Sequence, residues 1–233
     1  MRAKPRSYIF LAMGDEEEAP YTVQYLDGEE EETNWVSRAG KARATYPNGD
    51  VYEGDFAEDK SRTGQGTYRW KNQKDEEAEE PMATYTGGYV NGKREGQGTM
   101  TSARGKYRGE WKAGKMHGQG VYQYSGGDLY SGSWSAGKKH GQGTYLFQDA
   151  LSGDDCQYIG TWDNGDFAKG RWKLRDGTTF EGDFVGNKPS GDGTYKFQNG
   201  NTQLGEYIER RLEGDEYVND ETETRFLGGA ISS

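Results

Sequence analysis

Aromatic residues and glycines alternate with polar residues along most of the chain, at the two-residue period of a β-strand. Near the middle of the sequence the alternating positions read Tyr107-x-Gly109-x-Trp111 and Gly118-x-Gly120. This period predicts half-buried strands in which rings and glycines share one face, while the residues between them face water. We therefore expect strands rather than helices here.

A tight turn is predicted between these two runs. The dipeptide Ala113-Gly114 lies between them, and Asn-Gly takes the same place in neighbouring stretches. Such dipeptides favour two-residue hairpin loops, which need positive φ angles. A hairpin folded about this turn pairs Tyr107 with Gly120, Gly109 with Gly118 and Trp111 with Met116, so that rings lie over glycines.

The hairpin pattern is repeated along the chain. Residues 107–124 return as residues 130–147, and units begin near Tyr52, Tyr85, Tyr107, Tyr130, Tyr158 and Phe180. Two insertions, Lys71–Ala83 and Gln148–Cys156, leave the flanking pattern intact and are expected to be loops. A repeat of this length is typical of stacked units that contact only their neighbours. The predicted fold is all-β: an extended, single-layer antiparallel meander of stacked hairpins.

Two sets of residues are candidates for packing and binding. The first is a set of structural glycines that leave room for neighbouring rings: Gly109, Gly118, Gly120, Gly132, Gly141 and Gly143. The second is an aromatic face that a single-layer sheet cannot cover by itself. We predict that this face contacts partners through Tyr107, Trp111, Tyr130, Trp134, Tyr158, Trp162, Phe180 and Phe184.

The chain divides into three regions by pattern. Residues 1–39 form an N-terminal arm and acidic loop with a degenerate repeat, residues 40–207 the repeat array, and residues 208–233 a polar tail. The apolar run Tyr8–Met13 is shorter than a secretory core, and acidic residues follow it, so a short strand or docking arm is favoured over a signal peptide. Within the tail, residues 209–224 are polar with mixed charges and are expected to be extended or disordered and to order only against a partner.

Composition and charge exclude several classes of partner. Only 31% of residues are hydrophobic while 37 are glycine, which argues against a thick two-layer core. The net charge of −10 argues against nucleic acid and makes binding to anionic membranes unfavourable. Cys156 is the sole cysteine, which excludes an intrachain disulfide and favours a reducing compartment.

No constellation of residues predicts chemistry. His117 and His140 occupy equivalent repeat positions beside a turn and lack the further ligands that a metal needs. The Gly-x-Gly pairs open no helix and precede no Lys-Ser/Thr, so we expect no cofactor. Lys93, Lys115 and Lys138 mark repeated turns. Turn chemistry explains these lysines, and contact with ligand phosphates or an acidic partner remains an open alternative.

The repeated motif Tyr-x-Gly-x-Trp/Phe-x-x-Gly-Lys-x-x-Gly-x-Gly resembles the MORN repeat over about residues 40–207. The unit at Tyr158 lacks one of the paired glycines, and the unit at Tyr52 lacks the first turn glycine. Segments near the ends of the array resemble the MORN subunits of the ciliary radial spoke head: Tyr46–Gly54, His140–Leu146, Tyr158–Trp162 and Gly205–Tyr207.

That resemblance implies a structural role in the cytoplasm and cytoskeleton, at the axoneme of a motile cilium or flagellum. Its partners would be other axonemal or radial spoke proteins, and a homodimer is an alternative. Two other functional classes remain open: a phospholipid-binding module, and a regulatory segment of an enzyme complex. No catalytic domain accompanies the repeats, so we expect no enzyme activity.

Overall fold

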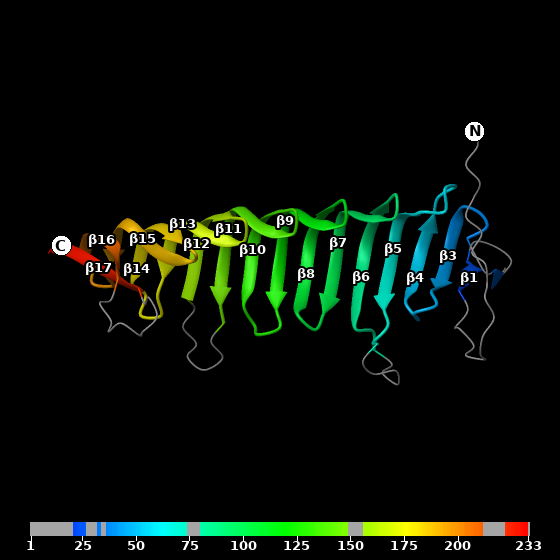
Figure 1. The fold of residues 1–233 in the computed structure, drawn as a ribbon, viewed down its shortest axis with the longest axis horizontal. Helices are drawn as coiled ribbons and strands as arrows, with labels where there is room; N and C mark the ends of the chain where they lie inside the picture. The colour runs from blue at the N-terminus through cyan, green and yellow to red at the C-terminus, as the bar shows by residue number, and fades with distance from the viewer. Residues whose placement is uncertain are drawn as a thin grey trace.

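The computed structural model describes residues 21–26, 32–33, 36–73, 80–148, 156–211 and 222–232. These residues form one long, twisted antiparallel sheet, with strands that run across its length (Figure 1). No helix occurs among them. The described part of the chain accordingly includes no helix able to cross a membrane. The prediction of an all-β, single-layer meander is confirmed.

The strands follow one another in the sheet in chain order from β3 onwards, and β1 lies between β3 and β2. Their bounds are β1 Thr22–Tyr25, β2 Glu32–Thr33, β3 Gly40–Thr45, β4 Val51–Phe56, β5 Arg62–Trp70, β6 Ala83–Val90, β7 Lys93–Ser102, β8 Gly105–Lys112, β9 Lys115–Tyr124, β10 Leu129–Ser135, β11 Lys138–Phe147, β12 Cys156–Asp163, β13 Asp166–Lys173, β14 Thr179–Val185, β15 Lys188–Lys196, β16 Thr202–Arg211 and β17 Thr222–Ser232.

The two-residue turns of the units that begin at Tyr85, Tyr107, Tyr130 and Tyr158 have the predicted conformation. Ala113 and Gly114 have φ angles of 49° and 84°, and Asn91 and Gly92 have φ angles of 49° and 75°. Positive φ at both central residues is the mark of a two-residue hairpin turn whose twist matches that of the strands. These four turns also bond to the unit before them, through the N–H of Gly92, Gly114, Gly137 or Gly165: the Gly114 N–H, for example, donates to the Arg94 carbonyl at 2.9 Å.

The predicted register within the hairpin is correct beside the turn and wrong beyond it. Trp111 pairs with Met116 as expected, but Tyr107 pairs with Tyr122 and Gly109 with Gly120. A β-bulge between Gly109 and Glu110 causes the shift, because β9 advances by three residues, from His117 to Gly120, where β8 advances by one. The shift is by two residues, so every side chain keeps its face. Similar bulges recur in neighbouring units.

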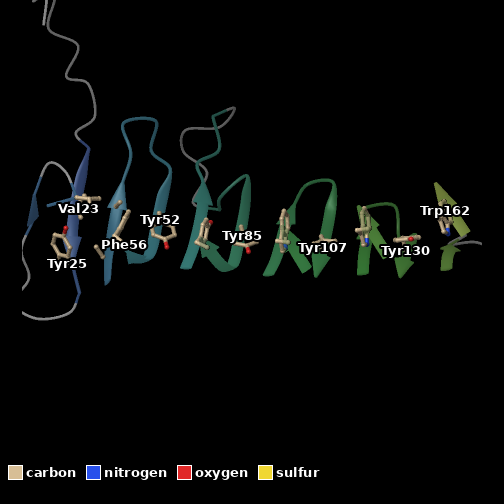
Figure 2. Packing of buried hydrophobic residues seen from close by; sticks show 14 of the residues in the cluster. Val23, Tyr25, Tyr52, Phe56, Tyr85, Tyr107, Tyr130 and Trp162 are labelled. Atoms are coloured by element: carbon tan, nitrogen blue, oxygen red, sulfur yellow. The ribbon is translucent and has the colours of Figure 1, made fainter. Parts of the chain in front are cut away.

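A continuous row of buried rings explains how one layer buries much of its own aromatic face. Figure 2 shows Tyr52, Tyr85, Tyr107, Tyr130 and Trp162 in a row that crosses successive strands. Within this row the Tyr107 ring meets Trp111 and Trp134 edge to face, with both centroid distances at 5.3 Å. This geometry is the favourable one for aromatic pairs. We call it the inner aromatic row: Tyr52, Phe56, Tyr85, Tyr89, Tyr107, Trp111, Tyr130, Trp134, Trp162, Phe167, Phe180 and Phe184.

The two ends of the sheet differ from the expected pattern. In the N-terminal region β1 buries Val23 and Tyr25 against the array. Residues 8–13, predicted as a strand or arm, lie outside the described residues. In the C-terminal region, β17 pairs with β16 and extends the sheet. The prediction that residues 209–224 order only against a partner is therefore wrong for residues 209–211 and 222–224, which pair with each other in β16 and β17. Further along β17, Phe226 packs on Tyr195 and Tyr207.

Candidate binding face

Seven of the eight aromatic residues predicted to contact partners are buried by the chain itself. Tyr107, Tyr130 and Phe180 are at most 1% exposed, and Trp111, Trp134, Trp162 and Phe184 are at most 5% exposed. The alternation within one hairpin places the rings over glycines but carries no information on the contacts that each ring makes with the next unit. These seven residues are packing residues, so direct contact with a partner must come from other side chains.

Tyr158 is the exception, and the irregular unit to which it belongs explains why. The bulge in the hairpin β12–β13 holds one residue fewer than the bulge in β8–β9. Phe167, which is 0% exposed, takes the buried place in the inner aromatic row. The Tyr158 ring stacks on it, with the ring centroids 4.7 Å apart and an interplanar angle of 6°. Tyr158 is consequently displaced to a half-buried position.

The predicted structural glycines have two distinct roles. A Cβ at Gly120 would lie 2.4 Å from the Tyr107 hydroxyl, and one at Gly143 would lie 2.4 Å from the Tyr130 hydroxyl. These rings therefore lie over glycines diagonally, although the predicted direct pairing was wrong. Gly109 and Gly132 complete the same contacts. Gly118 and Gly141 instead lie at bulges, with φ angles of 54° and 67°.

Hydrogen bonds fix the inner row to the bulges. The Tyr107 hydroxyl donates to the Glu110 carbonyl at 2.9 Å, and the Tyr130 hydroxyl donates to the Ser133 carbonyl at 2.9 Å. The Trp162 Nε1–H donates to the Gly143 carbonyl of the preceding unit at 3.2 Å. Burial raises the pKa of Tyr130 to about 12, so the buried hydroxyl remains a donor at neutral pH.

A second line of rings lies over the inner row and remains partly exposed. We call it the outer aromatic row: Tyr21, Tyr46, Tyr68, Trp70, Tyr122, Tyr124, Tyr145, Tyr158, Trp172, Tyr195, Tyr207 and Phe226. Neighbouring members contact one another. The ring centroids of Tyr122 and Tyr124 lie 4.4 Å apart, and those of Tyr68 and Trp70 lie 4.5 Å apart. The aromatic surface that a partner can reach is this row.

Three cations recur at one position of the repeat, two residues after the turn glycine or its equivalent. They are Arg62, Arg94 and Lys139, and Met116 holds the same position in the unit between the last two. Among the residues that the structure describes, none of the three has a carboxylate oxygen within the 4.0 Å of a salt bridge. The cations singled out from the sequence are instead the neighbouring lysines Lys93, Lys115 and Lys138. An alignment of the repeat units reveals that the half-buried cations recur at one position.

The two arginines line a cavity of about 240 Å³ on the aromatic face, together with Tyr68, Trp70 and Tyr89. Arg94 lies over the Trp111 ring at 4.3 Å and donates from Nη2 to the Gly114 carbonyl at 2.7 Å. Burial lowers the pKa of Arg94, and the nearby positive charge of Arg62 lowers it further. Two like charges therefore share one cavity.

Lys139 lines a second cavity, of about 300 Å³, with Tyr145, Phe147, Tyr158 and Trp162 among its walls. Its Nζ lies 4.0 Å from the centroid of the Trp162 ring and 4.6 Å from that of Tyr145. Burial lowers the pKa of Lys139 to about 8, and the negative charges of Asp166 and Asp128 offset this only in part. The displaced Tyr158 of the irregular unit supplies one wall.

The other predicted positions face solvent or the polar side. His140 is exposed, and its Nδ1 lies 3.3 Å from an Asp163 carboxylate oxygen. In the described part of the chain, no group of His, Cys, Asp or Glu side chains has the geometry to hold a metal ion. Lys93, Lys115 and Lys138 are exposed beside the turns, so turn chemistry and partner contact both remain open for them.

The polar face of the sheet carries cross-strand pairs rather than a site. Lys169 Nζ lies 3.0 Å from an Asp183 oxygen, and the Gln119 side-chain amide donates to the Ser133 hydroxyl at 2.8 Å. Exposed pairs of this kind contribute little stability but keep the face solvated. The two faces therefore differ: among the described residues, the aromatic face combines rings with half-buried cations that form no salt bridge.

Comparison with known proteins identifies the repeat. The sequence profile of the family described as MORN repeat matches residues 52–74, 85–106, 107–129, 130–150 and 180–202. MORN repeat-containing protein 3 of Xenopus laevis is 35% identical over 98 residues, which is 39% of this chain and 37% of that protein. The chain thus spans well under half the length of this relative. The irregular unit at Tyr158 lies outside the matched segments. These matches agree with the stacked hairpins, and the five matched segments, which make up just under half of the chain, are MORN repeats.

Proposed function

We propose that the protein is a non-catalytic scaffold that binds other proteins along its outer aromatic row. The observation that supports this proposal best is the row itself. Partly exposed rings follow the sheet over its whole length on one face, and nothing in the described chain covers them. Soluble proteins rarely expose contiguous apolar surface of this extent unless it binds something.

We further propose that the assembly it serves is cytoskeletal, at the axoneme of a motile cilium or flagellum, with the radial spoke head as the specific place. The support for this finer assignment is the resemblance of the segments named above, among them Tyr46–Gly54 and His140–Leu146. An elongated, single-layer sheet suits a structural subunit, since it presents one continuous surface to several neighbours at once.

The test is the position of the tagged protein in a ciliated cell before and after detergent extraction. The proposal predicts an axonemal signal that survives extraction, and a diffuse or membrane signal rejects it. Sedimentation of anionic vesicles with the pure protein tests the phospholipid class directly. Sedimentation of the pure protein at micromolar concentration separates a monomer that recruits other proteins from a homodimer.

A further inference from the structure

The half-buried cations on the aromatic face form no salt bridge within the described chain, although Asp166 and Asp128 partly offset the charge of Lys139 from farther away. The protein has a net charge of −10, yet Arg62, Arg94 and Lys139 lie among rings with no carboxylate in salt-bridge contact. A half-buried charge without a partner destabilises the folded state. The loss is recovered when a ligand supplies the missing negative charge.

Each cavity combines such a charge with apolar walls, as a pocket for a carboxylate side chain requires. In the first cavity two guanidinium groups face the space beside Tyr68 and Trp70. In the second, the Lys139 ammonium lies beside Tyr145 and Trp162. A carboxylate bound there would form charge-assisted hydrogen bonds in surroundings that exclude much of the water, where such bonds are strong.

We propose that the two cavities are carboxylate subsites for one extended, acidic segment of a partner protein that lies along the outer aromatic row. This rests on the proposed function and names the chemistry of its partner. An extended backbone approaches the rings closely enough for short Asp or Glu side chains to reach the cations. A helix of about 10–12 Å diameter holds its axis farther from the face.

The sheet sets the spacing of the acidic residues. Arg94 lies on β7 and Lys139 on β11, so four strand spacings of about 4.8 Å separate the two subsites by about 19 Å. An extended segment covers that distance in about six residues. Met116 occupies the same repeat position on β9, midway between them, and is half-buried. The recognised pattern is therefore two acidic residues about six apart with an apolar residue midway.

A membrane surface is a poorer occupant than an acidic peptide. Lipid phosphates lie in a plane and are met by exposed lysines and arginines, whereas these cations lie among rings. The overall negative charge also repels an anionic bilayer. A lipid headgroup is kept as an outcome of the test.

The experiment is a selection of peptides from a random 12-residue library on the immobilised full chain. Selected peptides are then synthesised with a fluorophore and titrated by anisotropy against wild type, R94M, K139M and K169M. Methionine is chosen because Met116 shows that the fold accepts it at this position. Lys169 is the matched control, since it is exposed on the polar face and paired with Asp183.

We expect enriched peptides to carry the spaced acidic pair, and R94M and K139M each to weaken binding about tenfold or more. K169M should leave the affinity unchanged. Replacing either peptide glutamate by glutamine should give the same loss, and this change cannot disturb the fold of the protein.

The inference is overturned if the selection enriches no acidic pair, or if R94M and K139M bind the selected peptides with the same affinity as wild type. Binding to phosphatidylserine vesicles is measured in parallel. If wild type binds the vesicles, R94M and K139M do not, and the selection yields no acidic peptides, the cavities are assigned to a lipid headgroup and the inference is overturned. The localisation test of the proposed scaffold role is independent of either result, so failure here is distinct from failure of that role.

Discussion

The close approach of the Tyr107 ring to Gly120 predicts that Gly120→Ala destabilises the protein, although alanine is small and usually harmless in a strand. The new Cβ would lie 2.4 Å from the Tyr107 Oη and 2.6 Å from ring carbons. The ring cannot yield freely, because Trp111 and Trp134 contact it edge to face at 5.3 Å and its hydroxyl donates to the Glu110 carbonyl.

The magnitude follows from these contacts. Overpacking costs about 1–3 kcal/mol, and loss of the hydroxyl hydrogen bond adds about 1 kcal/mol. Replacing glycine stabilises by about 0.4–1 kcal/mol through the unfolded chain where φ is not positive, as at Gly120. The net loss in the free energy of unfolding is about 2 kcal/mol, which lowers Tm by about 4–8 °C for a chain of this size.

The assay is urea and thermal unfolding followed by tryptophan fluorescence, with Gly126→Ala as the matched control. Gly126 has no positive φ and no atom within 4 Å of its Cβ position, so its substitution should be neutral or stabilising. In a Tyr107→Ala background, Gly120→Ala should no longer destabilise. Equal midpoints for Gly120→Ala and Gly126→Ala, or a loss that persists without the ring, would refute the packing of the ring over the glycine.

Three further predictions concern charge and hydrogen bonding. K139M should raise the free energy of unfolding at neutral pH by about 1–2 kcal/mol after allowance for solvent screening. Folding lowers the pKa of Lys139 from 10.5 to about 8. The free energy of unfolding of the wild type should therefore rise between pH 8 and pH 10.5, and this rise should be absent in K139M. Trp162→Phe should cost about 1 kcal/mol in urea unfolding, through loss of the bond to the Gly143 carbonyl; a variant as stable as wild type contradicts this role. Folding raises the pKa of Tyr130 from 10.0 to about 12, so its contribution to stability is full below pH 10.0 and lost as the pH rises through about 12. Tyrosinate absorbance followed alongside unfolding checks this, and titration of every tyrosine at its ordinary pKa in the folded protein counts against it.

The local features of the fold could be predicted from the sequence, because each depends on a few adjacent residues. The turn at Ala113-Gly114, with positive φ at both residues, is an example. The face of each side chain was also predictable, since the bulge shifts the register by two residues and leaves the alternation intact.

The features that were missed depend on contacts between units. The bulge beside Gly118 is stabilised by the Tyr107 hydroxyl bond and by Gln119 N–H donation to the Glu110 carboxylate at 2.8 Å. Burial of Trp134 arises from the ring of Tyr107 in the preceding unit. No pattern within one hairpin contains this information. The pairing of β17 with β16 was missed because residues 208–233 lack the repeat motif.

The direction of the strands has a mechanical consequence. Because the strands run across the long axis of the sheet (Figure 1), tension between its two ends pulls along the hydrogen bonds, and every strand junction carries the full load in series. Under tension such a sheet separates junction by junction, starting from its weakest ladder. Among the described junctions from β3 to β17, the shortest paired register joins β13 to β14, where Lys169–Lys173 face Thr179–Asp183. A segment bound along the aromatic face on both sides of this junction would bear load in parallel with it, and so reinforce the sheet where it yields first.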